Sequence, residues 1–154
     1  MSQERVSTFA SGMQRALYEL VRSYEACDQA CLAQHGVTAA QGYTLLALAD
    51  HSDVTMNELS EAMGLASSTM TRMVDHLVRK GLVGRRHDDE DRRVVRVWLT
   101  AEGKRVRCAL ESERQYLMER VLGEIEENER PTVLSALQKV AKLIRKAMET
   151  CCNG

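Results

Sequence analysis

The 154-residue sequence contains a single proline, Pro131, and only nine glycines. Proline breaks helices, and disordered or loop-rich chains are usually rich in both residues, so this scarcity argues against such a chain. Internal repeats and low-complexity linkers are also absent from the sequence. These absences predict a mainly α-helical protein with few long loops.

Long apolar runs are missing as well. No stretch approaches the roughly 18 apolar residues of a membrane-spanning helix, and the N-terminal "MSQERVSTFASGMQ" has no signal-peptide hydrophobic segment. We therefore expect no membrane association and a cytoplasmic protein. In that reducing compartment, cysteines are expected to be free thiols, metal ligands or redox sensors before structural disulfides. The chain has five: Cys27, Cys31, Cys108, Cys151 and Cys152.

Motifs of common enzyme sites are not found. The sequence has no Gly-rich phosphate loop, no nucleophile elbow and no H-E-x-x-H motif, and its four histidines show no metal-ligand spacing. We therefore expect that the protein is not an enzyme.

Helical periodicity and helix-ending residues dominate what is present. They predict six helices, over about 4–34, 39–50, 56–63, 67–80, 101–128 and 131–150. After Gly81 the period changes to two, and "LVGRR" and "VVRVWL" around "HDDEDR" predict a β-hairpin. The fold class is thus mainly α with a small β wing.

Residues 37–100 have the pattern of a winged helix-turn-helix lobe. Thr55 and Glu58 form a T-x-x-E capping box before a short helix, and Gly64 then interrupts the chain. The following helix is rich in Ser, Thr and Arg, and the hairpin takes the position of the wing.

Positive charge is concentrated on this motif. Residues 66–107 contain eleven Lys or Arg and six acids, a balance of +5 in a chain of formal charge −1. Such a basic stretch is typical of a DNA-binding surface, although a solvated charged face is the alternative. The residues predicted to contact DNA from the first two turns of the recognition helix are Ser67, Ser68, Thr69, Thr71 and Arg72.

The tip of the hairpin carries two adjacent arginines. Arg93, and after it Arg92, are predicted to enter the minor groove beside the recognition helix. The acids around them are expected to keep the tip solvated and to orient an arginine through an ion pair.

Three motifs in this region resemble the MarR family of bacterial transcriptional regulators. They are K-G-L-V at Lys80 to Val83, D-x-R at Asp91 to Arg93, and L-T-x-x-G at Leu99 to Gly103. The resemblance covers nearly the whole chain. It implies a homodimer with intertwined terminal helices, two winged lobes on a pseudo-palindromic double-stranded operator, a wing supported by Asp91, and Arg93 in the minor groove. One departure is Ala66, since the family often has a capping Asp before the recognition helix.

The apolar residues of the long helices support a dimer without reference to the family. The stripes on the terminal helices are larger than one lobe could cover, so a second subunit is expected to bury them. They include Leu110, Tyr116, Leu117, Val121, Leu122, Ile125, Val133, Leu134, Leu137, Val140, Ile144 and Met148. Residues 1–36 and 101–154 are therefore predicted to form a helical dimerisation region.

Cysteines are the most distinctive candidates for sensing a signal. Cys27 and Cys31 lie on one helix face at i,i+4, close enough to share a soft metal or metalloid ion. The family fold brings the helix of Cys108 near them, so a three-thiolate site and disulfide formation are both hypotheses. The alternatives are a small organic inducer, such as a phenolic or aromatic acid, and cysteines that only pack.

The sequence therefore predicts a homodimeric, sequence-specific DNA-binding regulator, a repressor that a small ligand, soft ion or thiol oxidation releases from DNA. The alternative is a winged-helix module that binds a partner protein and no DNA. Retention of Arg72 and Arg93 favours the DNA-binding reading.

Overall fold

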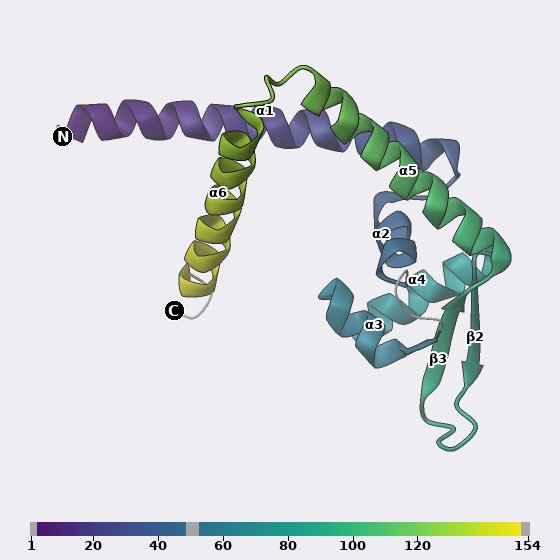
Figure 1. Cartoon of the computed structure of the whole chain (residues 1–154). Helices are drawn as coiled ribbons and strands as arrows, with labels where there is room; N and C mark the ends of the chain where they lie inside the picture. The colour runs from purple at the N-terminus through teal and green to yellow at the C-terminus, as the bar shows by residue number, and fades with distance from the viewer. Residues whose placement is uncertain (1–2, 49–52, 152–154) are drawn as a thin grey trace. The chain divides into compact units, whose positions relative to one another are not determined.

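The computed structural model describes residues 3–48 and 53–151. The chain divides into two compact units, Met1–Glu113 and Arg114–Gly154, with the boundary inside one helix. Figure 1 shows the elements, which in chain order are α1 (Gln3–Gln34), α2 (Ala39–Ala47), β1 (Val54–Thr55), α3 (Met56–Met63), α4 (Ser67–Arg79), β2 (Val83–His87), β3 (Val95–Leu99), α5 (Ala101–Gly123) and α6 (Arg130–Cys151). The prediction of a mainly α fold with a small β wing is confirmed.

Side-chain caps explain where two helices of the lobe begin. Thr55 and Glu58 form the predicted capping box of α3: Glu58 N donates to Thr55 Oγ1 at 3.1 Å, and Thr55 N donates to Glu58 Oε2 at 2.7 Å. Thr38 and Gln41 cap α2 in the same reciprocal way. The last two residues of the predicted second helix, Ala49 and Asp50, lie outside the described residues.

A three-stranded antiparallel sheet holds the wing. Its strand order is β1-β3-β2, with Val83 opposite Leu99 and His87 opposite Val95 in the predicted hairpin. The third strand, β1, was not predicted. It has only two residues, and Val54 is recognisable as a strand residue only through its long-range pairing with Val97.

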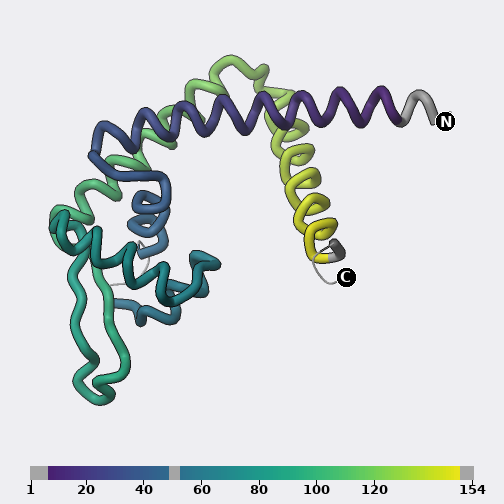
Figure 2. Tube along the Cα trace, turned by 180° about the vertical axis from the view of Figure 1, so that it is seen from behind, coloured from purple at the N-terminus to yellow at the C-terminus, as the bar shows by residue number. Residues whose placement is uncertain are grey.

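One apolar core holds the first unit together. It draws on the end of α1, on α2, α3 and α4, on the sheet and on the start of α5, through Leu32, Val37, Leu45, Leu48, Val54, Met56, Leu59, Met70, Val74, Leu77, Leu82, Val83, Val97, Leu99, Val106 and Leu110. Figure 2 shows the end of α1 beside α2 in this lobe, while the rest of α1 extends past it. Leu110 is only 1% exposed, so the expectation that it requires a second subunit was wrong. The predicted division into lobe and dimerisation region stays a prediction.

A hydrogen-bonded junction connects the segment that follows α4 to the start of α5. The hydroxyl of Thr100 donates to Gly81 O at 2.6 Å and accepts from Gly103 N at 3.0 Å. Gly81 adopts φ +72, which suits glycine, and Thr100 N donates to Leu82 O at 3.1 Å. A Cβ on Gly103 would lie 1.9 Å from Leu82 O, so only glycine fits here. The L-T-x-x-G motif is therefore a structural joint.

The second unit comprises the end of α5 and α6. Helix α5 ends at Gly123, about five residues before the predicted end, because glycine has a low helix propensity. Glu124 N and Ile125 N then donate to carbonyls three residues back. Helix α6 begins at Arg130, so Pro131 lies in its first turn, as predicted. In the described part of the chain, no helix is both long and apolar enough to cross a membrane.

Candidate nucleic-acid interface

Helix α4 presents a polar face to solvent and an apolar face to the core. Met70, Val74 and Leu77 form the buried face, whereas most of the residues predicted to contact DNA are exposed: Ser67, Ser68, Thr69 and Arg72. Thr71 differs from these, because it is half-buried and its hydroxyl donates to Ser67 O at 2.8 Å. It also lines a pocket of about 350 Å³ between α4 and the wing.

Among the described residues, no side chain caps the N-terminus of α4. Its N-cap residue is Ala66, in extended conformation at φ −63 and ψ 143, and neither Ala66 nor Ser67 supplies a capping hydrogen bond. The first amides of a helix point outward and carry partial positive charge. This end of α4 therefore has the chemistry of an anion-binding helix terminus, flanked by exposed hydroxyls.

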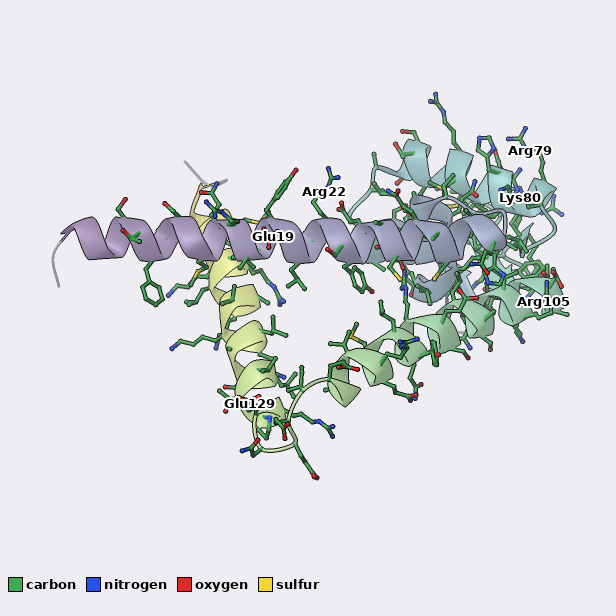
Figure 3. All side chains as sticks on the ribbon, turned by 90° about the horizontal axis from the view of Figure 1, so that it is seen from above. Glu19, Arg22, Arg79, Lys80, Arg105 and Glu129 are labelled. Atoms are coloured by element: carbon green, nitrogen blue, oxygen red, sulfur yellow. The ribbon has the colours of Figure 1, made fainter. Side chains whose placement is uncertain are left out.

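The basic residues of the lobe fall into two groups. Seven of the eleven between residues 66 and 107 have partners within the protein: Arg79, Lys80, Arg85, Arg86, Arg96, Arg105 and Arg107. The other four are exposed and make no side-chain hydrogen bond or ion pair with any described residue: Arg72, Arg92, Arg93 and Lys104. Figure 3 shows Arg79, Lys80 and Arg105 at one end of the lobe, remote from Glu19 and Arg22 on the extended part of α1.

The group without internal partners includes all three arginines that the sequence predicted to contact DNA. Arg72 projects from the polar face of α4, and Arg92 and Arg93 lie at the tip of the wing. A guanidinium without an internal partner keeps all five of its donors for an external acceptor such as a phosphate or a base edge.

An aspartate other than the one implied by the family organises most of the wing turn. Asp88 Oδ1 accepts from Glu90 N at 2.9 Å and from Asp91 N at 3.2 Å, and Asp88 Oδ2 accepts from Arg96 Nε at 2.6 Å. The Arg96 hydrogen bond, followed by the two amides, lowers the pKa of Asp88 to about 2. Asp91 Oδ1 accepts from the backbone N of Arg93 at 2.9 Å, so Asp91 shapes the turn. The expected ion pair between these acids and Arg92 or Arg93 is not formed.

Further side chains brace the base of the wing. Arg86 lies over the Trp98 ring at 5.8 Å and 3.5 Å from Asp53, which Arg96 approaches at 4.0 Å. Sequence reasoning missed this cluster and Asp88. The sequence held one local signal for the role of Asp88. An aspartate two residues before a backbone amide in a turn is typical of an Asx-turn.

The thiols are only partly arranged as predicted. Cys27 and Cys31 are half-buried and lie four residues apart on α1. Burial, followed by the nearby Glu113 and Cys27, raises the pKa of Cys31 to about 11. Cys108 is exposed, because Val106 and Leu110 occupy the buried face of α5 and a residue midway between them points away. Among the described residues, no group of three or more His, Cys, Asp or Glu could hold a metal ion. The three-thiolate hypothesis is therefore not supported. The α5 side chain near Cys31 is Glu113 instead of Cys108.

Comparisons with known proteins agree with this geometry. The model of the MarR family matches residues 35–94. The HTH-type transcriptional repressor MdtR of Bacillus subtilis (strain 168) is 32% identical over 137 residues, which cover 89% of this chain and 86% of MdtR.

Solved structures show the same fold. The YusO protein from Bacillus subtilis has 29% identity and a TM-score of 0.76, covering 92% of this chain and 99% of its own. FabT of Streptococcus pneumoniae, solved in complex with DNA, has a TM-score of 0.82 at 18% identity, covering 90% and 99%. With a winged lobe and a relative that matches along most of both chains, the protein belongs to the MarR family of winged helix-turn-helix transcriptional regulators.

Proposed function

We propose that the protein is a homodimeric, sequence-specific DNA-binding regulator, which represses transcription until a signal releases it from a pseudo-palindromic operator. The observation that carries this proposal is the distribution of unpaired arginines. Arg72 on α4 and Arg92 and Arg93 on the wing are the exposed guanidiniums of the motif that no described residue engages.

The first turns of α4 and the tip of the wing suit different features of DNA. The first turns of α4 combine uncapped amides with exposed hydroxyls, which favours phosphate contacts at the edge of the major groove. Arg72, one turn further, is suited to a bidentate contact with guanine. A narrow minor groove has an enhanced negative potential, which would attract Arg93 or Arg92.

Relatives support the same function. FabT was solved in complex with DNA, and MdtR is named a transcriptional repressor. We extend both properties to this chain as part of the proposal.

The homodimer is supported by apolar residues that the single chain leaves exposed. Phe9 on α1 is 80% exposed, and Leu134 on α6 is 58% exposed. Exposed apolar residues also recur along α1, the end of α5 and α6, including Met13, Leu20, Tyr116, Val121, Leu122, Leu137, Ile144 and Met148. Such extensive apolar surface is typical of a protein–protein interface, and a symmetric dimer would bury it.

The experiment is a fluorescence anisotropy titration with promoter DNA from the gene's own neighbourhood, repeated over a series of salt concentrations. We expect tighter binding to one promoter than to scrambled DNA of equal length. Affinity should fall steeply with salt, because each neutralised phosphate releases counterions. Binding that is weak and independent of sequence would contradict the proposal and favour a protein-interaction module. Adding candidate inducers, either phenolic acids or thiol-reactive agents, then tests release.

A further inference from the structure

Two thiols of α1 are placed to act together on one ligand. Cys27 and Cys31 are both free and half-buried, and their i,i+4 spacing places them on one face of α1. The carboxylate of Glu113 on α5 lies near Cys31, and its Oε1 lies 3.0 Å from His35 Nε2. The pair therefore lies where α1 contacts α5 within the first unit.

A direct disulfide does not suit this pair. Residues at i,i+4 on a helix have Cβ atoms about 5–6 Å apart, whereas a disulfide needs about 3.5–4.5 Å. Closing an S–S bond would therefore distort α1. A single bridging atom has a longer reach: with bonds of about 2.3 Å to each sulfur, as in zinc thiolates, the sulfurs stay nearly 4 Å apart.

Reactivity also disfavours oxidation. Burial, followed by the nearby Glu113 carboxylate, raises the pKa of Cys31 to about 11. Cys31 is therefore a thiol at neutral pH, whereas peroxide reacts with thiolates.

The atom bound at this site must require only two sulfur ligands from the protein. Structural zinc requires four ligands, and the described residues offer no group of three or more His, Cys, Asp or Glu for a metal ion. Trivalent arsenic forms three bonds, so two can go to cysteines and the third to a hydroxyl or carbon substituent.

We propose that Cys27 and Cys31 form a dithiol binding site for trivalent arsenicals. Arsenous acid reacts by condensation: two As–O bonds and two S–H bonds break, and two As–S bonds and two molecules of water form. No oxidant is needed, because arsenic keeps its oxidation state. The Glu113 carboxylate lies near the Cys31 thiol and can pass the proton of this thiol to the departing hydroxyl, which leaves as water.

Occupation of the site acts on a contact between α5 and the end of α1. The arsenic group would lie near Glu113, whose carboxylate contacts His35 just after α1. Helix α5 is joined to the wing through Thr100, so this change reaches the candidate DNA interface. This consequence for DNA depends on the proposed function, whereas arsenical binding does not.

The test uses phenylarsine oxide on the full chain with Cys108, Cys151 and Cys152 replaced by Ser. Intact-mass spectrometry should show one phenylarsenic group per chain. A phenylarsenic group that is bound by both cysteines should stay on the protein in excess β-mercaptoethanol, which is a monothiol. The dithiol 2,3-dimercaptopropanol should remove it. In the same background, Cys31→Ser should lose the group to β-mercaptoethanol, and so should Cys27→Ser, which provides a second variant if the first does not fold.

A matched control keeps two thiols and changes only their spacing. Cys31→Ser combined with Gln29→Cys places the second thiol two residues from Cys27, on another face of α1. Equal retention by this control would overturn the proposal, as would failure of the original pair to retain the group. Peroxide should leave the Cys31 thiol of the original pair titratable.

DNA binding is measured separately by anisotropy. Phenylarsine oxide should weaken operator binding of the original pair at least tenfold and leave Cys31→Ser unaffected. An adduct that forms without any loss of affinity would overturn the regulatory consequence alone. A chain that binds arsenic and never binds DNA would overturn the proposed function and leave the site intact.

Discussion

At the scale of single residues, the structure separates arginines that hold the lobe together from arginines that face solvent. Arg85, Arg86 and Arg96 pair with acids of the lobe, whereas Arg72 and Arg93 do not. Net charge along the sequence cannot make this distinction, because paired and unpaired arginines contribute equally to it. Partners within the protein therefore decide which arginines can contribute to binding.

Arg93→Ala is expected to weaken operator binding by about 1–3 kcal/mol, because it removes a free guanidinium from the wing tip. Arg105→Ala is the matched control, since it removes the same charge from a residue already paired with Glu102. Anisotropy at a single salt concentration, with circular dichroism to verify folding, compares the two. Equal losses in both variants would contradict a specific role for Arg93 and indicate only a general charge effect.

Asp88 should titrate far below an ordinary aspartate. Because its folded-state pKa is lowered from 3.8 to about 2, its contribution to stability is complete above about pH 4 and is lost as the pH falls towards 2. Arg96→Ala removes the largest cause of the shift, so the pKa of Asp88 should rise towards 3.8. NMR titration of the side-chain carboxyl measures this. Arg85→Ala, which breaks the separate pair with Asp75, should leave the Asp88 titration unchanged.

At the scale of helices and strands, the joint between α4 and α5 depends on the absence of a side chain at residue 103. Gly103→Ala should destabilise the protein by about 1–3 kcal/mol, because the new methyl group would collide with the Leu82 carbonyl. Gly12→Ala is the control: nothing lies within 4 Å, and a helix-interior alanine should stabilise by about 0.5–1 kcal/mol. Denaturant unfolding at one protein concentration measures both. Equal stability of Gly103→Ala and wild type would contradict this prediction, because the junction would then accommodate the methyl group without cost.

Elements with local signals were predictable from the sequence. The start of α3 just after its N-cap residue Thr55 and the end of α4 before Gly81 follow from capping and glycine positions within a few residues. The end of α5 was misplaced because the acidic segment after Gly123 has no proline or other strong helix breaker. Strand β1 was missed because its partner, Val97, lies more than forty residues away.

The candidate site was predictable as a surface and less so as a set of contacts. Exposure of Arg72 and Arg93 follows from helix and hairpin periodicity. The hydrogen bond from Arg96 to Asp88 depends on strand register and on the shape of the turn. Residue spacing alone therefore could not show that Asp88 pairs with Arg96 and not with Arg92. The place of Cys108 depended on the rotation of α5 about its axis, which Val106 and Leu110 determine by packing in the core.

At the scale of the whole molecule, the exposed apolar residues predict the oligomeric state. Light scattering at micromolar concentration should give about twice the chain mass of 17.3 kDa. Leu137→Glu should shift the protein towards a monomer, because this exposed α6 residue would carry a charge into the interface. Gln138→Glu, at the exposed neighbouring position, is the control for added charge. A mass near that of one chain for the wild type would contradict the dimer.

The uncapped start of α4 has a consequence for the free protein. With no side chain to accept from them, the amide hydrogens of Ser67, Ser68 and Thr69 are open to exchange with solvent. A DNA phosphate seated at this end would supply the missing acceptor, and exchange of these hydrogens would slow while the rest of α4 changed little. Hydrogen–deuterium exchange would thus report occupancy of the recognition helix from inside the protein, without a label on the DNA.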